Sequence, residues 1–187
     1  MNPARFCRFV CVCLLALSAL ASAQRHRDPF TQQEIDQIRD ASWEPQQRLK
    51  LYVQFARDRL VKLEEMRNDP KTKDRPGQTH DMLDDFLLIY DELNDNLDTY
   101  VDRKDDIRKP LKTVIEADTE FQAKLRALKD AADVSLTESK VYEFVLSNAV
   151  DTLDTSVEDH RKLLVDQEDA AKRKKLNARA KNNGKPE

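Results

Sequence analysis

Residues 24–167 contain a single glycine, Gly77, and this scarcity constrains the fold more than any other feature of the sequence. Sheets and phosphate-binding loops usually need several glycines at their turns, because glycine adopts backbone conformations that other residues avoid. Apolar residues recur through the same region at steps of three and four, which is the spacing of one helix face. We therefore expect an all-helical protein.

The first expected helix is short and covers residues 31–42, after a flexible lead-in over residues 24–30. It begins with Thr31-Gln32-Gln33-Glu34, a capping box in which the first and fourth side chains each accept from the other residue's backbone N–H. Phe30 and Ile35 stand at the two positions of a hydrophobic staple.

A second helix is expected over residues 45–68, because proline is tolerated in a first turn and Pro45 stands there. Its apolar stripe steps by four, three, four and three. The stripe consists of Leu49, Val53, Ala56, Leu60 and Leu63, widened by Tyr52 and Phe55. Residues 69–77 carry two prolines, a glycine and several charges without apolar periodicity, which indicates a surface loop.

Thr79 is expected to cap a third helix, and a fourth helix follows it. Their stripes are Leu83, Phe86, Tyr90, Leu93, Leu97 and Tyr100, and then Leu111, Val114, Phe121, Leu125 and Leu128. No glycine separates the two stripes, so the chain either reverses near residues 102–106 or continues as one long helix kinked at Pro110. We favour the reversal, because it gives helices of matched length.

A second capping box, Ser135-Leu136-Thr137-Glu138, starts the last expected helix. Its inward residues are Val141, Val145, Ala149, Leu153, Val157 and Leu164. The apolar pattern stops at Gln167, and residues 168–187 are expected to form a basic helical overhang and a disordered tail. The basic residues of this segment are Lys172, Arg173, Lys174, Lys175, Arg179, Lys181 and Lys185.

Four long amphipathic helices with short connections predict an all-α fold, an antiparallel up-down four-helix bundle over residues 31–167 with a short extra N-terminal helix covering one end. The alternative is a spectrin-like hairpin that completes its core by dimerising, because stripes of this spacing also suit coiled coils. A homodimer is therefore a second possibility for the assembly.

Residues 1–23 have the organisation of a secretory signal peptide. Arg5 and Arg8 precede an apolar stretch over residues 9–20, and small residues lead up to Ala23. The stretch is shorter than the roughly 20 residues of a spanning helix. We expect cleavage near Ala23 and a mature protein, periplasmic or secreted, without a transmembrane segment. All three cysteines leave with the signal, so the mature chain forms no disulfide.

The mature chain carries 30 basic and 35 acidic residues, a balance that argues against general nucleic-acid binding. The basic overhang lacks interleaved aromatic residues and a strong apolar face, which are typical of segments that bind nucleic acids or membranes. We expect it to be a solubilising end. The expected partner of the protein is another protein or an envelope component.

The sequence offers little for catalysis or for a cofactor. The mature histidines are His26, His80 and His160, and no serine lies in a known nucleophile motif. Helical bundles that hold di-iron sites use Glu-x-x-His pairs, but Gly77 and Val157 stand three residues before His80 and His160. We expect neither an enzyme nor a cofactor.

The third expected helix is strongly acidic, with ten Asp or Glu residues from Thr79 to Asp106 against Arg103 and Lys104. Five carboxylates fall on one narrow face: Asp84, Asp91, Asp95, Asp98 and Asp102. This row is a candidate for binding calcium, a cationic peptide or the protein's own basic tail. Tight calcium sites wrap six to eight oxygens around the ion from a flexible loop, which a straight row does not do. We expect a solvated face.

Three further residues call for an interpretation. His160 falls on the inner stripe of the last helix, where it is either a ligand or pH switch or, as we expect, a partly buried side chain at the bundle edge. Trp43 is expected to plug one end of the bundle rather than line a ligand surface. An enzymatic alternative requires Asp118 and Glu116 to be buried together with raised pKa values, and Asp118 is the one expected in the core.

The segment from Arg48 to Glu64 contains the pattern A-x-x-R-L-x-x-L-E, formed by Ala56, Arg59, Leu60, Leu63 and Glu64. It resembles a helix found in uncharacterised exported helical proteins of bacteria. The resemblance implies export and helicity and carries no activity. The first functional hypothesis is a non-enzymatic exported binding or scaffold protein of the bacterial envelope, and the second is a cation-responsive protein that uses the acidic third helix.

Overall fold

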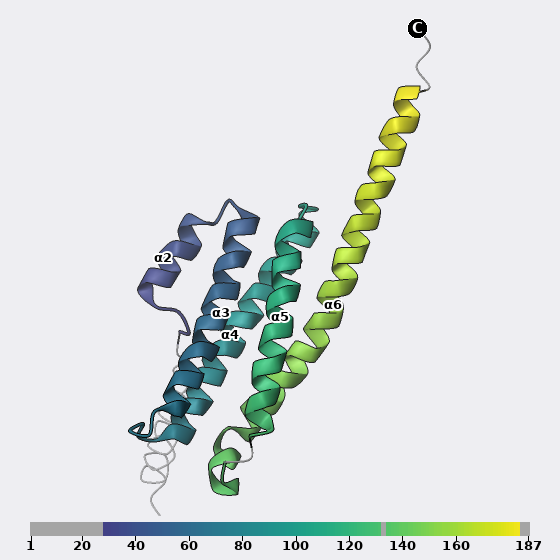
Figure 1. The fold of residues 1–187 in the computed structure, drawn as a ribbon. Helices are drawn as coiled ribbons and strands as arrows, with labels where there is room; N and C mark the ends of the chain where they lie inside the picture. The colour runs from purple at the N-terminus through teal and green to yellow at the C-terminus, as the bar shows by residue number, and fades with distance from the viewer. Residues whose placement is uncertain (1–27, 132–133, 184–187) are drawn as a thin grey trace, which may run out of the picture.

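The computed structural model describes residues 28–131 and 134–183, with the backbone alone for residues 181–183 (Figure 1). In these ranges the chain forms helices and no strand, which confirms the expected all-α fold. The helices are α2 (Gln32–Asp40), α3 (Pro45–Asn68), α4 (Arg75–Asp102), α5 (Arg108–Lys129) and α6 (Leu136–Asn183). The predicted signal peptide, most of the predicted lead-in and residues 184–187 of the predicted tail lie outside the described residues.

The four long helices form the expected bundle, and the short α2 packs against α3. The helices α3 and α4 make one antiparallel hairpin, and α5 and α6 make a second one (Figure 1). The two hairpins pack with α3 beside α5 and α4 beside α6, so that α4 and α5 face each other across a diagonal of the bundle. The connection from α4 to α5 therefore crosses one end of the bundle.

The first described residues adopt the local structure that the sequence predicts. The Glu34 N–H donates to Thr31 Oγ1 at 3.3 Å and the Thr31 N–H donates to Glu34 Oε2 at 2.7 Å, which confirms the first capping box. Phe30 packs edge to face against Tyr52 and Phe55 of α3, with ring centroids 5.9 and 6.2 Å apart. These contacts hold the entry to α2 against the bundle.

Helix α4 begins earlier than predicted, so the surface loop is shorter. Its cap is Asp74, which has a left-handed backbone (φ 48°) and whose Oδ1 accepts from the Gly77 N–H at 3.3 Å. A Cβ on Gly77 would collide with the Asp74 carboxylate, so a larger residue at this position would displace the capping side chain. The prediction that Thr79 caps the helix is wrong: Thr79 is buried inside α4 and its hydroxyl donates to the Arg75 carbonyl at 2.8 Å.

The chain reverses after Asp102, as expected, and does not continue as a kinked helix. Lys104 supplies the left-handed residue of the turn (φ 62°), although the segment contains no glycine. Gln167 of α6 holds the turn, because its side chain accepts from the Ile107 N–H at 3.1 Å and donates to the Asp105 carbonyl at 3.2 Å. Pro110 lies in the first turn of α5, where its missing N–H removes no helical bond.

The start of α6 departs from the prediction in two ways. Val141 is exposed and Tyr142 is buried in its place, beneath the Arg67 guanidinium at 5.6 Å from the ring centre. The Glu138 N–H donates to Ser135 Oγ at 3.2 Å, which forms half of the second capping box. The Glu138 carboxylate is instead bound by Arg75, with Nη2 at 2.6 Å. Glu138 thereby joins the start of α6 to α4.

The buried face of each long helix supplies the core, and the stripes predicted for α3 and α4 are buried throughout. The aromatic centre of the core is formed by Phe86 and Tyr90 of α4 against Phe121 of α5, with ring centroids 5.5 and 6.4 Å apart. None of the described helices has a stretch that is both long and apolar enough to span a membrane.

Candidate functional site

Three polar side chains from three helices meet inside the core. Tyr90 of α4 donates its hydroxyl to Asp118 Oδ1 of α5 at 2.8 Å, and His160 Nδ1 of α6 lies 2.8 Å from Asp118 Oδ2. Tyr90 and Asp118 are fully buried and His160 is 5% exposed. This network joins the diagonal pair α4 and α5 to α6, which neighbours both.

Asp118 and His160 replace apolar residues on otherwise regular helix stripes. Asp118 lies between Val114 and Phe121, which are both buried, and the sequence correctly places it in the core. His160 follows Val157 by three residues on the buried side of α6 and is more deeply buried than predicted. A buried carboxylate is tolerated when its oxygens accept hydrogen bonds. Each Asp118 oxygen has one such partner.

Each Asp118 oxygen faces one partner: the Tyr90 hydroxyl donates to Oδ1, and the His160 ring nitrogen Nδ1 lies at hydrogen-bond distance from Oδ2. Burial raises the pKa of Tyr90 well above its ordinary value, and the Asp118 charge raises it further, so the phenol stays protonated. His160 Nε2 bonds no residue in the described part of the chain.

A groove of about 320 Å³ runs between α4 and α6 and reaches His160. Its lining residues are Asn94, Leu97, Asp98 and Val101 of α4, with Ser156, Asp159, His160 and Leu163 of α6. Among these, Asp98 and Asp159 form no ion pair with another described residue. No lysine or arginine of the described residues lines the groove. Its polar lining is therefore dominated by hydrogen-bond acceptors.

The Asn94 side chain forms a hydrogen bond with its amide nitrogen but not with its amide oxygen in the described part of the chain. Its Nδ2 donates to Ser156 Oγ at 3.3 Å across the groove, which ties α4 to α6. Its Oδ1 is buried and has no hydrogen-bond partner in the described part of the chain. A buried polar atom that is left unpaired typically costs about 1–3 kcal/mol.

The network differs from a hydrolytic triad. Hydrolases also use an aspartate to orient a histidine, but the second ring nitrogen must bond a nucleophilic hydroxyl. No hydroxyl in residues 28–131 or 134–180 bonds His160 Nε2. Glu116 is exposed, so it does not share a buried site with Asp118 as the enzymatic alternative requires.

The predicted acidic row lies on the surface of α4, and its five carboxylates, Asp84, Asp91, Asp95, Asp98 and Asp102, are all exposed. Partial burial raises the pKa of Asp91, and the nearby charges of Asp95 and Glu92 raise it further. Only Asp98 of the five lines the groove. Within the described residues, no three His, Cys, Asp or Glu side chains stand close enough to hold a metal ion.

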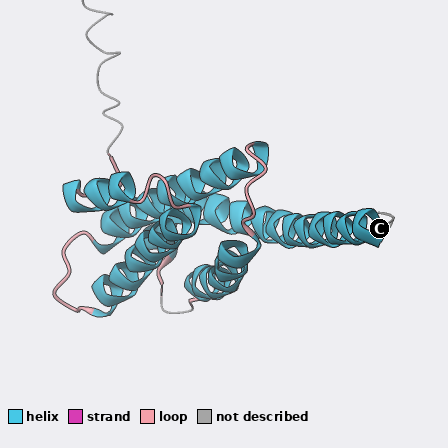
Figure 2. Ribbon diagram, turned by 90° about the horizontal axis from the view of Figure 1, so that it is seen from above, coloured by secondary structure: helices cyan, strands magenta, loops and turns pink. Residues whose placement is uncertain are grey.

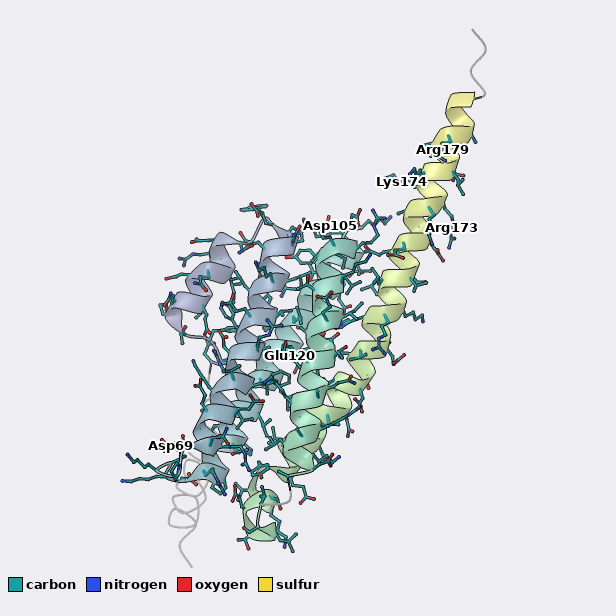
Figure 3. The ribbon with its side chains drawn as sticks, viewed as in Figure 1. Asp69, Asp105, Glu120, Arg173, Lys174 and Arg179 are labelled. Carbon is teal, nitrogen blue, oxygen red and sulfur yellow. The ribbon has the colours of Figure 1, made fainter. Side chains whose placement is uncertain are left out.

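Helix α6 continues far beyond the other helices (Figure 2). Its residues 170–183 form an extension that we call the arm. Nearly every arm side chain up to residue 180 is exposed. Arg173, Lys174 and Arg179 extend from it into solvent (Figure 3). These three and Lys175 form no ion pair with another described residue. The arm thus presents unpaired positive charge.

Comparison with known proteins does not assign this chain to a family. No protein family, curated protein or solved structure significantly matches this chain. The function is therefore inferred from the groove, the buried network and the arm.

Sequence reasoning missed two members of this site and misplaced another side chain. The sequence pattern indicates an ordinary core aromatic residue at Tyr90 and a surface residue at Asn94. Their hydrogen-bond partners lie on other helices, so the local sequence does not reveal them. Asp118 and His160, two polar residues on predicted inward stripes, were the signals in the sequence for a buried polar contact. The prediction that Trp43 plugs the bundle end is wrong: Trp43 is 90% exposed in the turn between α2 and α3.

Proposed function

We propose that this chain is an exported, non-enzymatic binding protein that holds an acidic protein partner on its arm. The observation that carries the proposal is the continuation of α6 beyond the bundle, with four basic side chains that have no ion-pair partner in the described chain. An isolated helix gains nothing from the bundle core, so a role outside the bundle accounts for its length.

The distribution of charge supports an acidic partner. Residues 168–187 carry seven basic and three acidic residues, whereas residues 24–167 carry 23 basic and 32 acidic residues. The arm is therefore a positive end on a negative molecule. A separation of charge of this kind orients an incoming acidic surface toward the arm and away from the bundle.

The composition of the arm favours a protein over a membrane. Helices that lie in a membrane surface bury a broad apolar face, and Leu176 is the one large apolar side chain among residues 170–180. Alanines at positions 170, 171, 178 and 180 favour a persistent helix instead. A straight helix with basic side chains on several sides suits a groove or face lined with carboxylates.

The experiment compares two variants that lose the same charge. The arm variant combines Arg173→Gln, Lys174→Gln, Lys175→Gln and Arg179→Gln. The control variant combines Lys50→Gln, Lys62→Gln, Lys109→Gln and Lys140→Gln, four exposed bundle residues without an ion-pair partner in the described chain. The wild type and both variants are immobilised and used to capture proteins from extracellular and envelope extracts. Capture is measured at 150 mM and at about 500 mM salt, because salt screening weakens exposed ion pairs.

We expect the wild type and the control to capture the same acidic proteins, with at least a tenfold loss for the arm variant and for high salt. Equal capture by the arm variant would refute the proposal. Binding of the wild type to anionic lipid vesicles, lost in the arm variant and without protein capture, would overturn the choice of a protein partner.

A further inference from the structure

We infer that the acidic partner of the arm is a second copy of this chain, an assignment that rests on the proposed function. The arm of one copy lies along the outer face of α4 in the other copy. A two-fold axis between the copies makes this contact reciprocal, so it forms twice and the assembly closes as a dimer.

The two surfaces carry opposite charge throughout. Residues 91–102 of α4, named the acidic segment here, contain five acidic residues and no basic one. The arm contains six basic residues and no acidic one. The aspartates of the acidic segment are exposed and form no ion pair with another described residue; they are Asp91, Asp95, Asp98 and Asp102. Surfaces of opposite charge attract each other and set the orientation in which two molecules associate.

The arm cannot reach the acidic segment of its own copy. Helix α6 is continuous from Leu136 to Asn183 and runs in the same direction as α4 (Figure 1). The Gln167 side chain bonds the turn that follows α4, so the arm, which starts at residue 170, lies past the end of α4. An α4 helix from another copy is free of this restriction.

The charged rows of the two surfaces have matching spacing. The rows are Asp91, Asp95 and Asp98 on α4 and Arg179, Lys175 and Lys172 on the arm. In this order, both rows step by four and then by three residues. Two antiparallel helices rise equally per residue and therefore bring the three pairs together in one register. Because α4 and α6 run in the same direction in each copy, a two-fold axis perpendicular to them produces this antiparallel arrangement.

The acidic segment lacks a counter-charge in the single copy. Partial burial raises the pKa of Asp91, and the neighbouring charges of Asp95 and Glu92 raise it further. Asp159 of α6 adds another carboxylate beside Asp98, and no basic residue of the described chain lines the groove between them. A basic helix on this surface offsets the repulsion between these like charges.

The test is sedimentation velocity of the full mature protein, residues 24–187, over a wide range of protein concentration. It is performed at about 50 mM and about 500 mM salt, because salt screens exposed ion pairs. We expect a dimer whose dissociation constant is at least tenfold higher at the higher salt. A wild type that stays monomeric at every concentration would overturn the inference.

Two charge reversals test which surfaces meet. The arm reversal combines Lys175→Glu and Arg179→Glu, and the segment reversal combines Asp95→Lys and Asp98→Lys. Each variant alone brings like charges together at both contacts, so each should be monomeric. Mixed in equal amounts, they should form a one-to-one dimer. The reversed arm of one then meets the reversed segment of the other, and the unchanged arm meets the unchanged segment.

The controls make the same changes in net charge at exposed bundle residues outside α4. They are Lys50→Glu with Lys62→Glu, and Glu65→Lys with Glu116→Lys, at positions without an ion-pair partner in the described chain. Both controls should still form the dimer, and circular dichroism verifies that every variant is folded.

A dimer formed by either reversal alone, or a mixture that stays monomeric, would contradict the inference. The proposed function fails separately. If the wild type is monomeric but its arm captures a different acidic protein, only the identity of the partner is wrong. If it neither dimerises nor captures a protein through the arm, both are wrong.

Discussion

Asp118 shows how one polar residue can organise a helical core. It is fully buried, and its two oxygens are occupied by Tyr90 and His160. Burying a charge is costly, and hydrogen bonds on both oxygens offset much of that cost. Because the two partners come from different helices, the carboxylate is satisfied only when α4, α5 and α6 bring all three side chains together. The network therefore favours a single packing arrangement over the many that apolar stripes alone allow.

Replacement of Asp118 tests this network through stability. We expect Asp118→Leu to lower the free energy of unfolding by about 3 kcal/mol, because it leaves the buried Tyr90 hydroxyl and the His160 ring nitrogen Nδ1 without a partner. Glu116→Leu, at an exposed position on the same helix, should change it by less than about 0.5 kcal/mol. Urea unfolding followed by circular dichroism measures both. Equal stabilities of Asp118→Leu and the wild type would show that the network contributes nothing.

The sequence indicates which residues are buried better than which residues meet. Periodicity places Asp118 and His160 on inward stripes, and both are buried. It does not reveal that Tyr90 reaches Asp118, because that bond crosses a diagonal between helices whose relative rotation no local pattern encodes. Val141 was misplaced for a related reason: Tyr142, next to it, fills the same end of the core under Arg67.

At the scale of elements, α2 is attached to the bundle by a bidentate ion pair. Arg59 of α3 donates to both Glu34 oxygens, at 2.9 and 2.7 Å, and to the Pro29 carbonyl at 2.6 Å. Both side chains are largely buried. Burial raises the pKa of Glu34, but donors from Arg59 and Thr31 outweigh this effect and hold the pKa below its ordinary value of 4.5.

This shift predicts the dependence of α2 on pH. A carboxyl whose pKa is lower in the folded state stabilises the fold above its unfolded pKa, and that contribution disappears as the pH falls through the folded pKa. Glu34→Gln keeps the capping box but removes the charge. We expect it to cost about 1–2 kcal/mol at pH 7 and almost nothing near pH 2.

Thermal unfolding of the Glu34→Gln variant and the wild type at several pH values measures the difference. Asp36→Asn, on the exposed side of α2, is the matched control and should be nearly neutral throughout. A Glu34→Gln effect of the same size at all pH values would contradict the assignment of the ion pair.

Most helix ends could be read from the sequence, and the exceptions have local causes. The bounds of α3 and the first capping box follow from side chains next to each other in the chain. The start of α4 does not, because it depends on Asp74 adopting a left-handed backbone before Pro76 and Gly77. The second capping box is incomplete because Arg75 and Arg67, distant in sequence, bind Glu138.

At the scale of the whole molecule, negative charge is concentrated on the bundle and positive charge on the arm. The acidic helix α4 and the helix that carries the basic arm are joined through the Gln167 contacts with the turn that follows α4. The sequence predicts four packed helices but not their order around the axis, because each stripe is equally apolar in either arrangement. The diagonal placement of α4 and α5 is thus information that only the tertiary structure provides.

The connection between α4 and α5 is a point at which the polypeptide can be divided into two hairpins. Each half is a self-contained hairpin, so cleavage between Arg103 and Lys104 interrupts no helix and no side chain of the buried network. We expect fragments 24–103 and 104–187, expressed separately and mixed, to reassemble into a helical one-to-one complex that light scattering and circular dichroism detect. Fragments divided between Lys71 and Thr72, which split a hairpin, should recombine less completely. If both cuts behave alike, the hairpins are not the units of assembly.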